Sequence, residues 1–224
     1  MFIKFPKPIF AAEFLEQEPV KEKILDTATE MFLGLGFKSV TMDDIATEMA
    51  ISKKTIYAHF DTKTKLVQAV TNHLFEKIDQ GIKDIRAQRM NPIEEIYEIK
   101  SFSMKYLKDE KTSPQYQLQK YYPKIYQSIS SRQYELVQCC VIENLERGIT
   151  TDHYRSDIPI SFISRIHFTG MMGLKDKDLF PAEEYSNSRL MEYFVEYHIR
   201  AISTPKGLET LQEFLTKRKK LNHA

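Results

Sequence analysis

The chain has 224 residues, of which 42% are hydrophobic, enough to bury a core in one large domain or two small ones. Its formal net charge of +1 gives no overall attraction to nucleic acid or to a membrane, so any such signal has to be local. Gly (7) and Pro (9) are few, and the prolines fall between helically periodic segments. This composition predicts an all-α fold.

The cysteines and the apolar runs exclude further classes of protein. Cys139 and Cys140 are adjacent, a spacing that rarely meets disulfide geometry, so we expect no disulfide framework and a reducing, cytoplasmic setting. They form either a redox-sensing pair or, as the favoured reading, small core residues of a helix. No run of about eighteen apolar residues exists, and we expect no membrane partner.

The N-terminal segment 1–19 is broken by Pro6 and Pro8 and lacks a long apolar core, so we predict an N-terminal arm rather than a signal peptide. A first helix is expected to start at Pro19 and to end at Gly36. Its helically spaced apolar residues are Ile24, Ala28, Met31, Phe32 and Leu35.

Two short helices follow, and a residue suited to an N-cap precedes each of them. Thr41 opens the first helix, with Asp44 three positions on as in a capping box, and Ser52 opens the second over "KKTIYAHF". A long helix is then predicted from about Lys63 to about Arg89.

Longer helices fill the rest of the chain. They are predicted over 92–108, over a short and a long segment separated near Pro123, over 159–175, over 186–202 and over a last segment from about 204. We therefore divide the chain into an arm (1–19), a helix-turn-helix DNA-binding domain (20–66) and a helical ligand-binding and dimerisation domain (67–224).

The helix of "ISKKTIYAHF" has two distinct faces when its residues are advanced by 100° each. Ile56 and Phe60 share the inner face. The predicted outer residues are Lys54, Thr55 and Ala58 at the centre, with Tyr57 and His59 on the flanks. Lysine and threonine can donate to base edges or phosphate, and the alanine methyl can contact a thymine methyl, so this face suits the major groove.

Positive charge is concentrated around this helix. Residues 52–65 contain four lysines (53, 54, 63 and 65) and one acid, Asp61, a surplus of three. Lys63 lies in the first turn of a helix, where the macrodipole disfavours a cation unless an anion such as phosphate is held there. A helical bundle with a solvated basic face explains the charges equally well when the helix is taken alone.

From Val20 to about Leu66 the sequence resembles the DNA-binding domain of the TetR family of bacterial transcriptional regulators. The resemblance rests on "FLGLGF" and on "TMDDIATEMAISKKTIYAHFDTKTKL", and it covers about a fifth of the chain. It implies DNA-contacting roles for a set of residues in this region. These are Thr41, Lys53, Lys54, Thr55, Tyr57, His59 and Lys63, to which the outer face of the helix adds Ala58.

Two positions depart from the family pattern. Ala50 stands where a turn glycine is common, and at a positive φ it would cost on the order of 1 kcal/mol. Lys54 stands where a glycine is frequent and adds a long donor close to the bases. Operator preference therefore does not carry over from the family to this chain.

The resemblance also implies a homodimer that binds a pseudo-palindromic operator and is released by a small lipophilic or aromatic effector. It places the dimer contact on the helices over 159–175 and 186–202, with Phe168, Met172, Leu190 and Phe194 as candidate contacts. The candidate effector-binding residues lie on the middle helices and on the first of these two. They are Tyr97, Met104, Tyr122, Tyr126, His167 and Met171, each of which also suits an ordinary core.

Two other classes of function remain to be weighed. The chain has no glycine-rich phosphate loop, no nucleophile elbow and no metal-ligand spacing among its scattered histidines, so we expect neither an enzyme nor a cofactor or metal. The alternative to the regulator is a helical module that binds small molecules or proteins and does not act through DNA.

Overall fold

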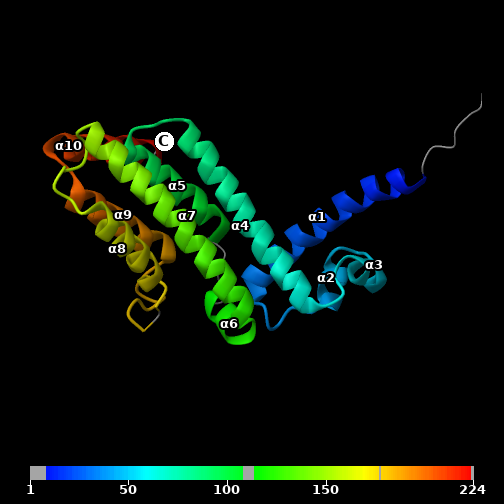
Figure 1. Cartoon of the computed structure of the whole chain (residues 1–224). Coiled ribbons are helices and arrows are strands. Elements are labelled where there is room, and N and C mark those ends of the chain that lie inside the picture. The colour runs from blue at the N-terminus through cyan, green and yellow to red at the C-terminus, as the bar shows by residue number, and fades with distance from the viewer. Residues whose placement is uncertain (1–8, 108–113, 177, 223–224) are drawn as a thin grey trace, which may run out of the picture. The chain divides into compact units, whose positions relative to one another are not determined.

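The computed structural model describes the backbone of residues 9–107, 114–176 and 178–222 (Figure 1). In these ranges the chain forms ten α-helices and no strand, which confirms the predicted all-α class. The helices are α1 (Ile9–Leu35), α2 (Met42–Glu48), α3 (Lys53–His59), α4 (Lys63–Ala87), α5 (Pro92–Leu107), α6 (Pro114–Tyr121), α7 (Pro123–Thr150), α8 (Ile160–Gly173), α9 (Asn187–Ile202) and α10 (Pro205–Asn222).

The chain packs as two compact units. Unit 1 comprises Met1–Glu76 with Asp109–Ile129, and unit 2 comprises Lys77–Lys108 with Ser130–Ala224. Helices α4 and α7 each contribute residues to both units. These are units of packing, and the functional boundary between residues 66 and 67 stays a prediction.

The core of unit 1 joins the first four helices to the segment that contains α6. Ile24, Ala28 and Phe32 of α1 are fully buried, as their helical spacing predicts. Two details of the first helix were predicted wrongly. Leu35 is 59% exposed, and α1 begins at Ile9, so Pro19 lies inside the helix and not at its start. The residues before Pro19 include the strong helix formers Ala, Glu, Leu and Gln, which outweigh the one proline.

The turn between α2 and α3 is a Schellman motif that requires a left-handed residue. The Ile51 N–H donates to the Ala46 carbonyl and the Ala50 N–H to the Thr47 carbonyl, both at 3.0 Å. Ala50 has φ of +52°, the conformation that favours glycine. Ala50, which stands where the family commonly has a turn glycine, therefore has the strained positive φ that the sequence comparison raised.

Replacing Ala50 with glycine should stabilise the protein by about 1 kcal/mol, because glycine adopts positive φ without a clash of its Cβ. Urea unfolding followed by circular dichroism would measure the change. Ala58→Gly, inside α3 and exposed, is the matched control and should lose up to about 1 kcal/mol. A loss of stability in Ala50→Gly would show that the turn does not strain the alanine.

In unit 2, α5 packs against both α9 and α10, and α8 packs against α9. The fully buried side chains of this core include Ile93, Leu145, Ile199, Ile202 and Leu211. A buried polar network crosses it: Asn144 donates to the Pro92 carbonyl and to Glu95 Oε1, both at 2.9 Å, and Tyr154 OH donates to Asn144 Oδ1 at 3.1 Å. No helix within the described residues combines the length and the apolar character that crossing a bilayer requires.

Candidate nucleic-acid interface

Both short helices of unit 1 begin at the side-chain caps that the sequence predicts. Thr41 Oγ1 accepts from the Asp44 N–H at 3.1 Å, and the Thr41 N–H donates to Asp44 Oδ2 at 2.8 Å, which completes a capping box. The Thr41 N–H bond also holds the pKa of Asp44 below its ordinary value. Ser52 Oγ accepts from the Thr55 N–H at 3.1 Å. The caps fix where α2 and α3 start and so fix the direction of α3.

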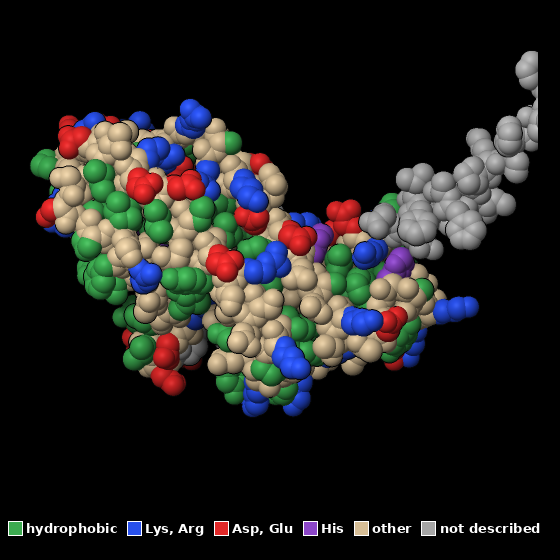
Figure 2. Space-filling view, in the orientation of Figure 1, with side chains coloured by type: hydrophobic (Ala, Val, Ile, Leu, Met, Phe, Trp, Pro, Cys, Tyr) green, Lys and Arg blue, Asp and Glu red, His purple; other side chains and the backbone are tan. Residues whose placement is uncertain are grey.

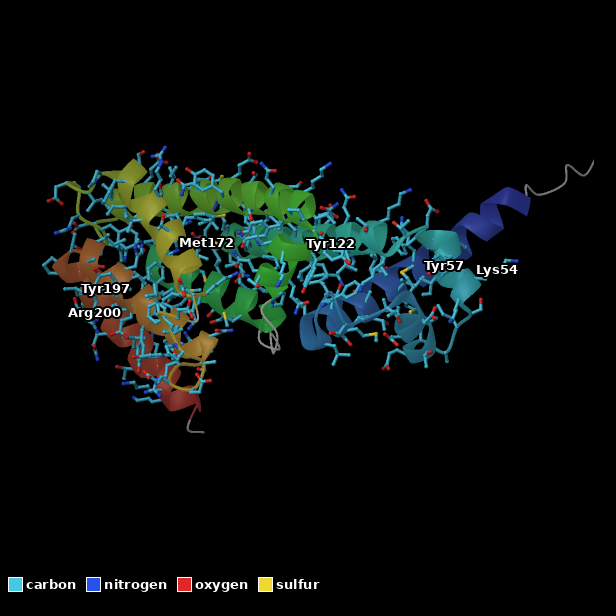
Figure 3. All side chains as sticks on the ribbon, turned by 90° about the horizontal axis from the view of Figure 1, so that it is seen from below. Lys54, Tyr57, Tyr122, Met172, Tyr197 and Arg200 are labelled. Atoms are coloured by element: carbon cyan, nitrogen blue, oxygen red, sulfur yellow. The ribbon has the colours of Figure 1, made fainter. Side chains whose placement is uncertain are left out.

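Helix α3 turns an apolar face into unit 1 and a polar face outward. Ile56 and Phe60 are buried in the core, as predicted. Lys54 and Ala58 are exposed, Tyr57 is 47% exposed, and Lys54 projects from the helix in Figure 3. These three side chains form what we call the α3 outer face.

Two of the predicted contact residues lie less openly on α3. Thr55 is half-buried, and its Oγ1 is 2.8 Å from Ser52 Oγ, so its hydroxyl belongs to the cap as much as to the surface. His59 is also half-buried, at the C-terminal end of the helix beside Phe60. Advancing the helix by 100° per residue places Thr55 at the centre of the outer face. It takes no account of the hydrogen bond between the Thr55 and Ser52 hydroxyls.

The lysines around α3 differ in whether they form an ion pair with a carboxylate. Lys53 forms an ion pair with Asp43 of α2, and Lys65 pairs with Asp61 at 2.6 Å. Counting Asp43 lowers the surplus from three to two, since four lysines then face two acids. Lys54 has no ion pair among the described residues and is the cation most available to a ligand.

Lys63 has a different environment at the N-terminus of α4. Its Nζ donates to the Lys38 carbonyl at 3.2 Å, and the side chain is half-buried. Burial lowers the pKa of Lys63, and the nearby Asp44 carboxylate partly opposes that shift. Lys38, which the sequence did not single out, is thereby fixed beside Lys63.

Figure 2 shows acidic and basic side chains interspersed over much of the visible face, in keeping with the near-neutral total charge of the chain.

The predicted effector residues fall in different compact units. Tyr122 and Tyr126 pack against the core of unit 1, and Gln115 Nε2 donates to Tyr126 OH at 3.3 Å. The other four are in unit 2, Tyr97 and Met104 on α5 and His167 and Met171 on α8. His167 contacts His198 of α9, with ring centroids 4.5 Å apart. The role of all six in ligand binding stays a prediction.

The predicted dimer residues on α8 and α9 are mostly turned into their own chain. Leu190 is buried, and Phe168, Met172 and Phe194 are half-buried. Gly170 allows the Phe194 ring to approach α8, because a Cβ on Gly170 would lie 2.3 Å from that ring.

Other large apolar side chains of the two helices are exposed instead. They are Phe162 (58%), Ile166 (47%), Tyr193 (51%) and Tyr197 (71%), which we call the α8–α9 outer surface. Figure 3 shows Tyr197 and Arg200 together on α9 and Met172 on α8. The i, i+4 spacing of each apolar pair is visible in the sequence, but it does not tell which face of the helix is exposed.

The two cysteines and the acidic residues that the structure describes form no assembled metal site. Cys139 is exposed and Cys140 buried, both as free thiols, and burial raises the pKa of Cys140. Among the described residues, no group of three or more His, Cys, Asp or Glu side chains is placed to hold a metal ion.

Comparisons with known proteins identify the first unit and the overall fold. Residues 24–70 match the family described as "Bacterial regulatory proteins, tetR family". Over 63 residues the chain is 33% identical to IcaR of Staphylococcus aureus, a negative transcriptional regulator of the icaADBC biofilm operon. A TetR-family regulator from Agrobacterium tumefaciens superposes over 84% of this chain and 100% of its own, with a TM-score of 0.68 and 16% identity.

Residues 24–70 thus belong to the TetR family. A second relative, the HTH-type transcriptional regulator SrpR of Pseudomonas putida, is 34% identical over 55 residues, which are 25% of this chain and 26% of SrpR. The match to IcaR covers 28% of this chain and 34% of IcaR. The chain thus spans about a quarter to a third of the curated relatives it matches, and the structural likeness beyond that region shows the fold alone.

Proposed function

We propose that this TetR-family protein is a transcriptional repressor that binds a specific duplex operator through α3. The observation that carries the proposal is the capped helix-turn-helix in which Ile56 and Phe60 are buried while the α3 outer face is free. A helix of this size fits the major groove, where lysine can donate to guanine and a methyl group can contact thymine. The negative regulation named for IcaR supports repression rather than activation.

The contacts around α3 divide into reading and positioning roles. Lys54 and Ala58 would touch base edges, whereas Tyr57, His59, Lys63 and the Thr41 hydroxyl would hold phosphates. Lys53 and Thr55 are already engaged by Asp43 and Ser52, so they would contribute less. A phosphate near Lys63 would supply the anion that the N-terminus of α4 favours.

A homodimer is the second part of the proposal. A two-fold pair would present two copies of α3 about 34–36 Å apart, or a little more, to the halves of a pseudo-palindrome. The α8–α9 outer surface supplies the exposed apolar residues such a contact needs, beside the half-buried Phe168, Met172 and Phe194.

Release by a small lipophilic or aromatic effector is the third part. The effector would favour a conformer in which α4 moves and separates the two recognition helices beyond groove spacing. By linkage, DNA and effector must weaken each other's binding by the same factor. The shift is limited to the difference in the effector's affinity for the two conformers.

Lys54→Ala should lose about 1–3 kcal/mol of discrimination between the operator and a scrambled duplex, because it removes a base contact. Fluorescence anisotropy on both duplexes would measure it, with an operator selected from a random-sequence library. Lys63→Ala should instead weaken both duplexes alike. Lys23→Ala, exposed on α1, is a control that should change neither. Unchanged specificity in Lys54→Ala would remove this residue from the reading role.

A further inference from the structure

In unit 2, α5 packs against α9 and α10 (Figure 1). Charged and aromatic side chains gather where these three helices meet. Tyr97 and Lys100 come from α5, Glu192 from α9, and Phe214 and Arg218 from α10. We call this group the Lys100–Arg218 cluster. DNA binding through α3 gives this cluster no role, and Tyr97 is its only member among the candidate effector-binding residues.

The cluster holds two cations but only one carboxylate, and that carboxylate is not close. Lys100 Nζ lies 3.6 Å from Glu192 Oε1, and Arg218 Nη1 lies 4.0 Å from the same oxygen. Both separations exceed the usual N–O hydrogen-bond distance of about 2.7–3.2 Å. The next acid, Glu196, is already paired with Arg200 at 2.7 Å. The cluster therefore carries a net charge of +1, from two cations and Glu192.

Burial makes this excess charge significant. The Lys100 side chain is only 7% exposed, and a buried ammonium without a close counter-ion is unfavourable. Arg218 Nη1 and Tyr97 OH are also buried, with no hydrogen-bond partner among the described residues. The two cations lie 5.6 and 5.5 Å from the centre of the Tyr97 ring, which compensates them only weakly. Burial lowers the pKa of Lys100, in accord with a cation that lacks full compensation.

We propose that the Lys100–Arg218 cluster binds the carboxylate group of a small acidic organic molecule. A guanidinium and an ammonium together match the two oxygens of a carboxylate, and one negative charge would neutralise the cluster. A phosphate dianion carries two negative charges and would leave the cluster with a net negative charge. The half-buried Phe214 ring offers apolar surface to the body of the ligand, and the 31% exposed Arg218 side chain marks the side open to solvent.

The direct test compares carboxylates with their neutral amides in thermal unfolding of the full chain. Benzoate and hexanoate should raise the melting temperature saturably, by about 5–10 °C at about 100 times Kd, and benzamide and hexanamide should not, at matched ionic strength. Arg218→Gln and Lys100→Gln should abolish the rise. Lys217→Gln and Lys219→Gln, exposed neighbours on α10, should keep it.

A second measurement needs no ligand. Lys100→Met keeps the length of the side chain and removes the buried charge, so its urea midpoint should equal or exceed that of the unaltered protein. A lower midpoint would mean that Lys100 serves as a structural partner of Glu192, and it would overturn the proposal. So would equal effects of acid and amide, an undiminished rise in Arg218→Gln, or a larger rise with inorganic phosphate. DNA is absent throughout, so these outcomes leave the proposed DNA binding untouched.

Discussion

Replacing His167 and His198 together by leucine should make the stability of the protein much less dependent on pH between about 4.5 and 6.5. The two rings meet between α8 and α9 and are nearly inaccessible to solvent. Burial, aided by the charge of His198, lowers the pKa of His167 from 6.5 to about 3, and burial lowers that of His198 to about 4.

The direction of the effect follows from the proton balance. Below pH 6.5 the unfolded chain binds protons that the folded protein cannot accept, so stability is highest above that pH and falls as the pH approaches the folded values. Each unit of pKa shift corresponds to about 1.4 kcal/mol, so the loss between pH 7 and pH 4.5 should be on the order of 4 kcal/mol.

Urea unfolding at a series of pH values would measure this dependence. Each single variant should remove part of the slope and the double variant most of it. Leucine will also alter the stability by an amount that does not depend on pH. The informative quantity is therefore the slope of the free energy of unfolding against pH. A double variant that keeps the original slope would place the acid-sensitive groups elsewhere.

Glu95→Gln should lower the free energy of unfolding by about 3 kcal/mol. Glu95 is 1% exposed, accepts from Asn144 and lies 2.6 Å from Arg147 Nη2, so it holds α7 to α5. Removing its charge leaves Arg147 without a close counter-ion. The partial exposure of Arg147, at 34%, keeps the loss from being larger.

Glu98→Gln is the matched control, because Glu98 is exposed on the same helix, and its change should stay within about 0.5 kcal/mol. Combining Glu95→Gln with Arg147→Met would complete a double-mutant cycle, which should show a coupling above about 1 kcal/mol. Additive losses, or equal effects of Glu95→Gln and Glu98→Gln, would contradict the role given to the ion pair.

Features fixed by neighbours three or four residues apart could be predicted from the sequence. Thr41 and Ser52 cap their helices as expected, Gly36 follows the end of α1 with φ of +91°, and Ile56 and Phe60 are buried. Each depends on backbone geometry within one helical turn, which residue type largely decides.

Features that depend on distant parts of the chain could not be predicted. No sequence spacing indicates that Asp43 pairs with Lys53, or that Tyr122 and Tyr126 pack against the core of unit 1 while His167 lies in unit 2. The i, i+4 apolar pairs of α8 and α9 exist on two faces, and only the fold shows that Tyr193 and Tyr197 are the exposed ones. Pairing across helices also created the Lys100–Arg218 cluster.

If α3 binds a specific operator, the complex depends on both salt and sequence, and a salt titration of binding checks both. The protein should prefer a duplex selected from a random library, or the region upstream of its own gene, over a scrambled duplex. With about six phosphate contacts shared by two protomers, affinity should fall about a thousandfold between about 50 and 200 mM salt. Lys63→Ala should reduce the slope of log K against log salt by about two, one contact per protomer. A folded protein that shows no salt-sensitive, sequence-preferring complex would contradict the account and favour a helical module that does not act through DNA.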